Sequence, residues 1–188
     1  IQRSIMNLDR ETGISIMKIK KELDSGPVSN IYKIKIDQNQ NAQEISEKLS
    51  ALAAEKILDN VDDILEDKAK FIDQDHSKAT YAKKIDKEES RIDWDEDASK
   101  IIGKINGLFP SPGASFSFNG ERYKILKAEI GNGIGQVGEI ISNQLEVACN
   151  KNQSIKILEI QRQGKRPQKI SEFMLGSQIK KGSKLSNV

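Results

Sequence analysis

Hydrophobic and polar positions in the first third of the chain predict two strands followed by a long helix. Apolar residues alternate with polar ones over 13–19 and again over 28–36, which is the period of half-buried strands. The polar segment 20–27 between them ends in turn residues. From 42 to 66, apolar residues recur at helical spacing, which predicts one long amphipathic helix or two in tandem.

The pattern then becomes irregular before a second, shorter helix. Residues 86–97 are too charged to form a core, and Trp94 is the one aromatic among them, so that a connector anchored by this ring fits best. Residues 98–108 predict a helix, which the Pro-Ser-Pro-Gly sequence at 110–113 ends.

Downstream of residue 113, short alternating segments are separated by turns. We expect strands at 114–118, 122–130, 138–141, 144–149 and 154–161. Asn119-Gly120 is a residue pair favoured in two-residue hairpin turns. Five or six short strands in so few residues predict a small closed barrel or a sandwich.

Charge divides the chain at about residue 100. Residues 1–99 carry 16 Lys and Arg against 22 Asp and Glu, whereas residues 100–188 carry 14 against 6. The densest basic stretch, from Arg162 to Lys184, has seven basic side chains and one acid. This split favours two units, the second facing a polyanion, with a solvated basic tail as the alternative.

The first half looks small for a unit of its own. Two strands and a helix cannot cover both faces of a sheet, and two-stranded units are marginal alone. The sequence also opens on Ile1, in what reads as the middle of a helix. We therefore expect the rest of a parallel sheet to lie upstream.

Two sequence features that could indicate a ligand site are better explained as a loop and as a surface residue. Residues 133–138 satisfy the G-x-G-x-x-G dinucleotide fingerprint, but the residues after them alternate like strands where that fingerprint requires a helix. His76 is the only histidine and lies among acids in a polar loop. Because a metal site needs several convergent ligands, we expect a surface residue there and no metal.

The cysteine and the hydropathy of the chain indicate its cellular compartment. Cys149 lies in an alternating apolar run, which predicts a small buried side chain, and a single cysteine without an internal disulfide suits a reducing cytoplasm. No apolar run approaches the ~20 residues that span a bilayer, and the first residues lack the apolar core of a signal peptide.

Several motifs, taken together, resemble those of methionyl-tRNA formyltransferases in order and spacing. They are Ile1-Gln-Arg-Ser-Ile5, Glu11-Thr-Gly13, Leu23-Asp-Ser-Gly26, Thr80-Tyr-Ala-Lys-Lys-Ile85, Lys87-Glu-Glu-Ser-Arg-Ile-Asp-Trp94, Phe109-Pro-Ser-Pro-Gly113 and Lys124-Ile-Leu-Lys-Ala128. The Leu-Asp-x-Gly loop alone is shared by several folate-dependent formyltransferases and hydrolases. Its combination with Arg-Ile-Asp-Trp and Pro-x-Pro-Gly is more specific. The resemblance is strong to about residue 130. The family usually has an aromatic where this chain has Ser111, so we expect looser packing there.

This resemblance implies an α/β + β fold class. Residues 1–80 would form the C-terminal portion of a Rossmann-like formyltransferase domain, and 81–97 a linker. Residues 98–188 would form a small OB-like β-barrel that binds tRNA.

The resemblance also implies an activity, in translation initiation. Members of the family transfer a formyl group from 10-formyltetrahydrofolate to the methionyl amino group of initiator tRNA, with an Asn, a His and an Asp. Asp24 matches the Asp, which would orient the His and relay a proton. Backbone groups of Glu22, Leu23 and Asp24 would line the folate pocket. The Asn and His are expected upstream of Ile1, so that the 188 residues alone should be inactive.

For the basic half, the +8 charge supports RNA binding independently of the resemblance. The candidate tRNA contacts are Arg162, Lys165, Arg166 and Lys169. We expect a cytoplasmic monomer. Two alternatives remain: a sugar-nucleotide formyltransferase, whose small acceptor needs no basic barrel, and a non-catalytic nucleic-acid-binding module, which would not need Asp24.

Overall fold

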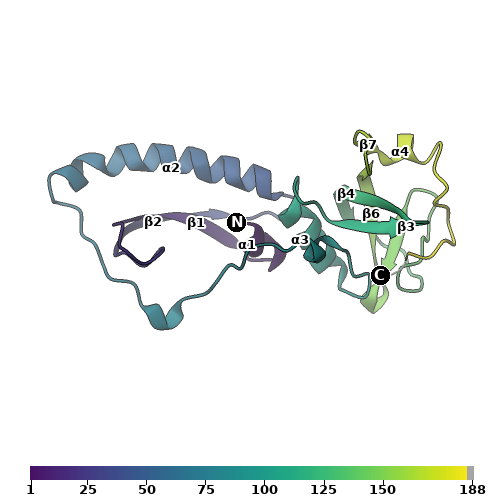
Figure 1. Ribbon diagram of the computed structural model, residues 1–188, viewed down its shortest axis with the longest axis horizontal. Coiled ribbons are helices and arrows are strands. Elements are labelled where there is room, and N and C mark those ends of the chain that lie inside the picture. The colour runs from purple at the N-terminus through teal and green to yellow at the C-terminus, as the bar shows by residue number, and fades with distance from the viewer. Residues whose placement is uncertain (186–188) are drawn as a thin grey trace.

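A computed structural model describes residues 1–185 and shows an elongated molecule. A β-hairpin with one long helix alongside it lies at one end, and a curled antiparallel sheet lies at the other (Figure 1). In chain order, the first part consists of α1 (Gln2–Met6), β1 (Glu11–Met17), β2 (Val28–Lys35) and α2 (Ala42–Leu65). The chain then returns along the hairpin to α3 (Ala98–Leu108), from which the curled sheet follows (Figure 1).

Strands β1 and β2 form an antiparallel pair against which the first turns of α2 pack. A capping box starts this helix: the Asn41 side chain accepts from the Glu44 amide at 3.0 Å, and the Glu44 carboxylate accepts from the Asn41 amide at 3.0 Å. Its buried side chains are Ala42, Ile45 and Leu49, all near its start. No helix within residues 1–185, α2 included, is long and apolar enough to cross a membrane.

The long return segment holds two 3₁₀ turns, His76–Lys78 and Glu88–Ser90. Trp94 is fully buried in the larger core, which agrees with the prediction of a connector anchored by this ring. Ile92 donates its amide to the Ser115 carbonyl at 2.9 Å, which ties the connector to the first strand of the curled sheet.

Helix α3 lies between α1 and the curled sheet, and Ile101, Ile105 and Leu108 are fully buried. Two glycines let the helices approach. A Cβ at Gly107 would lie 2.6 Å from Met6 Cγ, and one at Gly103 would lie 2.7 Å from a Leu8 methyl. The two ends of the molecule are therefore joined by close helix packing as well as by the chain.

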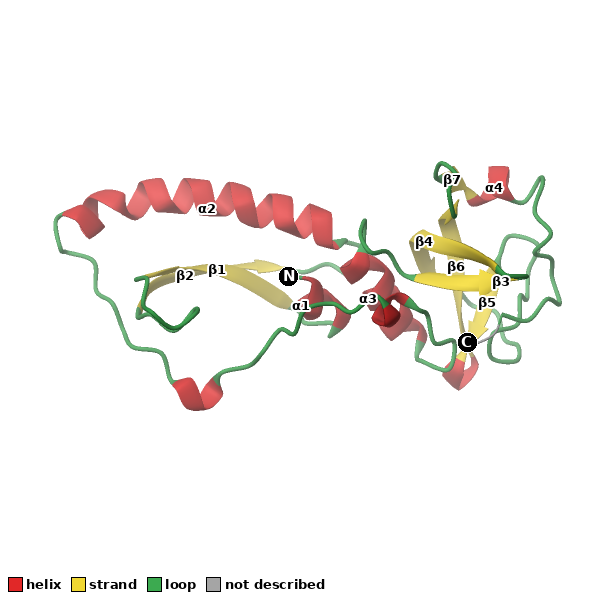
Figure 2. Ribbon diagram, viewed as in Figure 1, coloured by secondary structure: helices red, strands yellow, loops and turns green. Residues whose placement is uncertain are grey.

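The curled sheet is built from short strands, as the alternation downstream of residue 113 predicts (Figure 2). Its strands are β3 (Ser115–Phe118), β4 (Glu121–Ile130), β5 (Glu146–Cys149), β6 (Gln153–Arg162) and β7 (Gln168–Lys169), followed by α4 (Ile170–Phe173). The order is β3-β4-β6-β5, with β7 paired to β6, and all pairs are antiparallel. The hairpin at Asn119-Gly120 is confirmed, with φ values of 51° and 78°.

The expected strand at 138–141 forms only two isolated bridges, Glu139 with Lys184 and Ile140 with Val147. The backbone of Gly138 has φ 79°, outside the strand region, and accepts from the Leu185 amide at 2.8 Å. This segment is thus held between β5 and the C-terminal stretch. Residues 186–188 of the expected barrel lie outside the described part.

Candidate functional site

The loop that carries Asp24 joins β1 to β2 at the end of the molecule opposite the curled sheet (Figure 1). The Lys18 amide donates to the Pro27 carbonyl at 3.0 Å and closes the loop. Gln74, from the return segment, donates to the carbonyls of Asp24 at 2.9 Å and Gly26 at 2.7 Å. Asp24 has φ 53° and is exposed, and within residues 1–185 its carboxylate has no hydrogen-bond donor or cation as a partner.

Gly26 explains part of the Leu-Asp-Ser-Gly motif in steric terms. A Cβ at this position would lie 1.7 Å from the Lys18 carbonyl oxygen and 2.8 Å from its carbon, so that only glycine fits. Next along the chain, Val28 exchanges two hydrogen bonds with Ile72, of 2.8 and 2.9 Å. The loop is therefore shaped by backbone contacts rather than by side-chain packing.

The other two candidate folate-site residues, Glu22 and Leu23, are exposed in the same loop. The Ser25 hydroxyl donates to the Glu22 carbonyl at 3.0 Å, and Leu23 is 91% exposed. Glu22, Leu23 and Asp24 are thus exposed side by side, with the carbonyls of Glu22 and Asp24 already accepting hydrogen bonds within the loop and from Gln74.

Outside this loop, His76 and Cys149 lie in ordinary structural positions. His76 is exposed in a 3₁₀ turn, and residues 1–185 hold no group of three or more metal-ligating side chains. Cys149 is buried at 1% exposure, as predicted, and burial raises the pKa of its thiol to about 12.

Residues 133–138 form a loop, as predicted, and no helix opens at the third glycine. The Glu146 carboxylate holds the start of this loop. It accepts from the amides of Asn132 at 3.1 Å and Gly133 at 2.9 Å, and from the Ser154 hydroxyl at 2.7 Å. An acid that closes the loop from inside leaves no cradle for a dinucleotide phosphate there.

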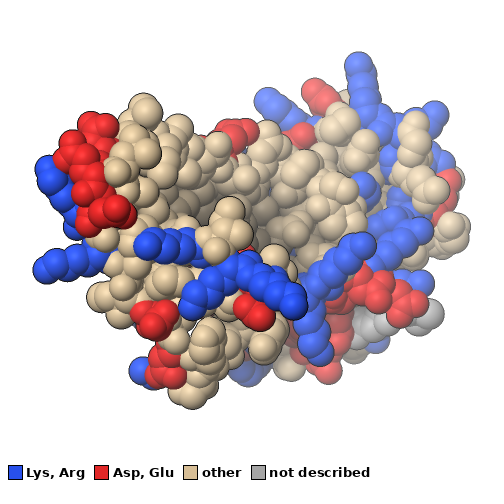
Figure 3. Space-filling view, turned by 60° about the vertical axis from the view of Figure 1, so that its left-hand side comes forward, with Lys and Arg blue, Asp and Glu red and all other residues tan. Residues whose placement is uncertain are grey.

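The four candidate tRNA contacts lie at one end of the curled sheet. Arg162 ends β6, Lys165 and Arg166 occupy the turn that follows, and Lys169 ends β7. The first three line a hollow of about 510 Å³. In Figure 3, Lys and Arg side chains are spread over the right-hand side and across the middle of this face, while Asp and Glu form separate clusters at the upper left and the lower right.

Arg162 differs from the other three because it is paired with a carboxylate, that of Glu121. The Tyr123 hydroxyl also donates to Glu121, at 2.8 Å. These two contacts, the tyrosine first, lower the pKa of Glu121, and burial together with Glu121 raises the pKa of Tyr123 to about 12. Within residues 1–185, Lys165, Arg166 and Lys169 form no ion pair, so they carry the uncompensated charge of this end.

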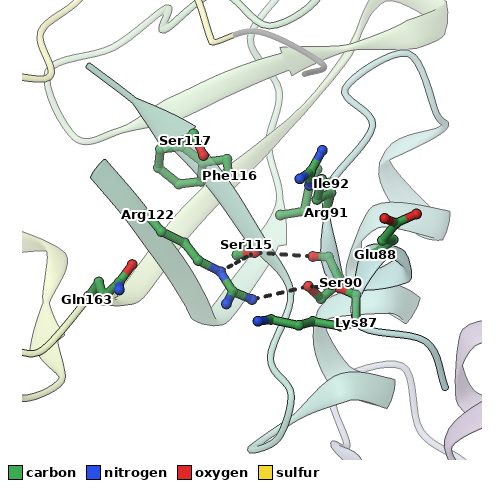
Figure 4. Close-up of a pocket in the computed structure, with 10 residues that line it drawn as sticks. All are labelled: Lys87, Glu88, Ser90, Arg91, Ile92, Ser115, Phe116, Ser117, Arg122 and Gln163. Atoms are coloured by element: carbon green, nitrogen blue, oxygen red, sulfur yellow. Dashed lines mark hydrogen bonds between the residues drawn. The ribbon is translucent and has the colours of Figure 1, made fainter. Parts of the chain in front are cut away.

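A second hollow, of about 410 Å³, lies between the connector and the curled sheet (Figure 4). Arg122 of β4 reaches across it and donates from Nε to the Ser115 hydroxyl at 3.0 Å and from Nη2 to the Ser90 hydroxyl at 3.1 Å. Ser90 and Ser115 are 1% and 2% exposed. Sequence reasoning did not single out Arg122, because Ser90 lies 32 residues away.

Comparison with known proteins places these features in a family. Residues 84–178 match the family described as formyl transferase, C-terminal domain. A methionyl-tRNA formyltransferase of Pelagibacter ubique (strain HTCC1062) is 64% identical over 188 residues, which is 100% of this chain and 61% of that protein. The chain therefore spans less than two thirds of that relative.

Solved structures share the fold at low identity. HypX from Aquifex aeolicus, in complex with tetrahydrofolic acid, aligns with a TM-score of 0.70 at 18% identity over 93% of this chain and 32% of that one. The N-formyltransferase from Helicobacter canadensis, in complex with folinic acid and dTDP-3-aminofucose, aligns with a TM-score of 0.68 at 18% identity over 85% of this chain and 58% of that one. With the family match over half its length, the chain belongs to the formyl transferase family, and residues 84–178 are the C-terminal domain of that family.

Proposed function

We propose that this chain is part of a methionyl-tRNA formyltransferase. The enzyme would move a formyl group from 10-formyltetrahydrofolate to the amino group of methionyl initiator tRNA, in translation initiation. The observation that carries this proposal is the 64% identity with a protein of that name along all 188 residues. The single buried Cys149 is in keeping with a reducing compartment, and we place the enzyme in the cytoplasm as a monomer.

Catalysis and tRNA binding would belong to different parts of the molecule. Residues 1–80 would be the C-terminal portion of the catalytic domain, 81–97 the linker, and 98–188 an OB-like barrel that holds the tRNA. The curl of the antiparallel sheet around one apolar core supports the barrel. So does the bridge from Arg91 in the connector to Ser115 in β3, which lengthens the sheet at its β3 edge.

Formyl transfer sets the chemical requirements at Asp24. The attacking amine must lose its proton, the tetrahedral oxyanion needs hydrogen-bond donors, and the leaving folate nitrogen needs a proton. Gln74 fixes the loop through backbone carbonyls and leaves the Asp24 carboxylate unengaged within the described residues. That carboxylate is thus available to orient a histidine and relay a proton, while backbone groups of the exposed residues Glu22, Leu23 and Asp24 would line the folate pocket.

At the other end, the basic residues would bind tRNA phosphates. Lys165, Arg166 and Lys169, with Arg162 beside them, would supply affinity without reading sequence. Discrimination of the initiator would then come from the approach of its acceptor end to the catalytic domain.

Two other functions fit less well. A sugar-nucleotide formyltransferase shares the fold, as the Helicobacter canadensis protein does, but a small aminosugar acceptor gives no reason for the unpaired basic side chains of the curled sheet. A non-catalytic RNA-binding module gives no reason for the glycine-dependent loop around Asp24.

Charge reversal at the basic end tests the proposed tRNA site. A variant with Lys165, Arg166 and Lys169 all changed to Glu should bind initiator tRNA at least about tenfold more weakly than wild type, with a flatter salt dependence, because phosphate contacts release counterions. Adding Arg162→Glu should deepen the loss. Since that change places two carboxylates together at Glu121, the triple variant is the primary test.

A matched control tests whether the change in net charge alone would weaken tRNA binding. Reversal at Lys48, Lys70 and Lys78, which are exposed in the first half, changes the net charge by the same amount and should alter binding much less. Fluorescence anisotropy with labelled tRNA at several salt concentrations measures both variants. Equal binding by the triple variant and wild type would refute the tRNA site.

A further inference from the structure

The alternation of β3 and β4 sorts their side chains onto two faces. Phe116, Tyr123 and Ile125 point into the core. Arg122 and Lys124 belong to the opposite, outer face, where Ser115 pairs with Lys124 and Ser117 with Arg122 in the strand register. The hollow beside the connector is therefore on a different face from the hollow at Arg162, which Tyr123 and Phe173 line.

Arg122 is held in position without being neutralised. Its two hydrogen bonds, at 3.0 and 3.1 Å, go to serine hydroxyls, and within residues 1–185 no carboxylate pairs with it. Arg3 and Arg162, in contrast, are paired with Glu89 and Glu121. A guanidinium that is already immobilised loses little side-chain entropy on binding, and its remaining N–H groups can donate to an oxyanion.

The charges around the hollow are mostly positive. Lys87, Arg91 and Arg122 line it, with Glu88 as the one acid. Figure 4 shows the Lys87 amine pointing toward the Arg122 guanidinium and the Glu88 carboxylate pointing away from both. Two cations that face one another repel, and an anion bound between them would attract both.

The remaining lining groups suit a phosphate rather than a base. Ser117 and Gln163 add a hydroxyl and an amide, whereas Phe116, the one aromatic ring there, is only 4% exposed and offers no face for stacking. A neighbouring hollow of about 250 Å³ shares Arg122 and Gln163 and adds Lys124. Two adjoining basic hollows along β4 fit a phosphodiester backbone better than one free phosphate.

We infer that Arg122, with Lys87, forms a second anion site between the connector and the curled sheet, and that its ligand is a backbone phosphate of the bound RNA. The inference rests on the proposed function, in which this half of the molecule holds tRNA. It adds a contact outside the hollow that Arg162, Lys165 and Arg166 line.

Two single substitutions test the site in the full 188-residue chain. Arg122→Gln should weaken initiator tRNA binding about five- to twentyfold and lower the slope of log affinity against log salt by about 0.9, the change expected for one lost phosphate contact. Lys87→Gln should weaken it in the same direction. Because Lys87 is exposed, this second variant is expected to leave the fold intact and so guards against a simple packing effect of Arg122→Gln. Lys100→Gln, on the exposed side of α3, is the control and should bind like wild type.

The outcomes separate this site from the proposed function. If wild type binds tRNA and Arg122→Gln or Lys87→Gln binds equally well, the second site is wrong while the tRNA-binding role stands. If wild type does not bind tRNA, the proposed function itself fails. A titration with inorganic phosphate, followed by NMR at the Arg122 Nε–H, distinguishes the ligand. Saturation by phosphate without any effect of Arg122→Gln on tRNA binding would assign the hollow to free phosphate and overturn the RNA contact.

Discussion

At the scale of single residues, Arg3 has the clearest structural role. Its guanidinium donates to the carbonyls of Lys83 at 3.0 Å and Lys84 at 3.1 Å, and it pairs with Glu89. Glu89 in turn accepts from the Asp86 amide at 2.8 Å. Three of the motifs behind the family resemblance therefore meet in space and fasten the connector to α1: Ile1 to Ile5, Thr80 to Ile85 and Lys87 to Trp94.

Glu89 should make stability depend on pH. The hydrogen bond from Arg3, then that from the Asp86 amide, lowers the pKa of Glu89 to about 2 from an ordinary 4.5. A lowered folded-state pKa stabilises the fold above the unfolded-state value and loses that effect as pH falls from about 4.5 to about 2. We predict that Glu89→Gln is less stable than wild type at pH 7 and that the gap narrows steadily as the pH falls to 2.

Urea unfolding of both proteins at pH 7, 4 and 2 measures this gap. Acid destabilises the protein through other carboxylates as well, so the difference between the two proteins is the quantity that matters. A gap that stays the same at all three values would show that Glu89 acts by shape and not by charge.

At the scale of elements, the β1–β2 hairpin depends on a glycine. Gly13 pairs with Lys33, and a Cβ there would lie 2.3 Å from the Tyr32 carbonyl oxygen, which is too close for any side chain. The glycine of the Glu-Thr-Gly motif is thus explained by packing of one strand's backbone on the other.

We predict that Gly13→Ala destabilises the protein by about 1–3 kcal/mol, the usual cost of forcing extra atoms into a closed contact. Gly176→Ala is the control, because nothing lies within 4 Å of its Cβ and it should change stability by less than about 0.5 kcal/mol. Urea midpoints give both values. Equal stability of the two variants would mean that the hairpin backbone relaxes freely around the new methyl group.

Local pattern predicted the elements that depend on nearby residues. The helices at 42–65 and 98–108 and the turn at Asn119-Gly120 follow from spacing and turn chemistry within a few residues. The segment 138–141 was less well predicted, because its backbone partners include Ser183 and Leu185, more than 40 residues later. Strand β7 was not predicted, since two residues hold too little pattern to read.

The same limit applies to the candidate site. The Asp24 loop could be proposed because its motif is contiguous, with Gly26 fixing its shape. The setting of Arg122 could not, since its hydroxyl partner Ser90 is distant in the chain and only the folded connector brings them together. Nor does the sequence indicate that Glu121 would pair with Arg162 across 41 residues.

At the scale of the whole molecule, the two proposed sites lie at opposite ends. The Asp24 loop is at the far end of the hairpin, and the basic hollows are on the curled sheet (Figure 1). Under the proposed function, a tRNA held by the sheet would extend its methionyl end along the molecule toward Asp24. The Arg3 contacts and the packing of α1 on α3 hold the two ends of the molecule together.

A formyl-transfer assay tests the proposed function most directly. This chain would be joined to the N-terminal part of the Pelagibacter ubique relative, and the fusion supplied with 10-formyltetrahydrofolate and methionyl initiator tRNA. Asp24→Asn is the matched variant, because Asn tolerates the left-handed backbone at φ 53° while removing the charge. We predict that the fusion produces formylmethionyl-tRNA and that Asp24→Asn lowers the rate at least about a hundredfold. A folded fusion that formylates a dTDP-linked aminosugar and leaves methionyl-tRNA unchanged would contradict it.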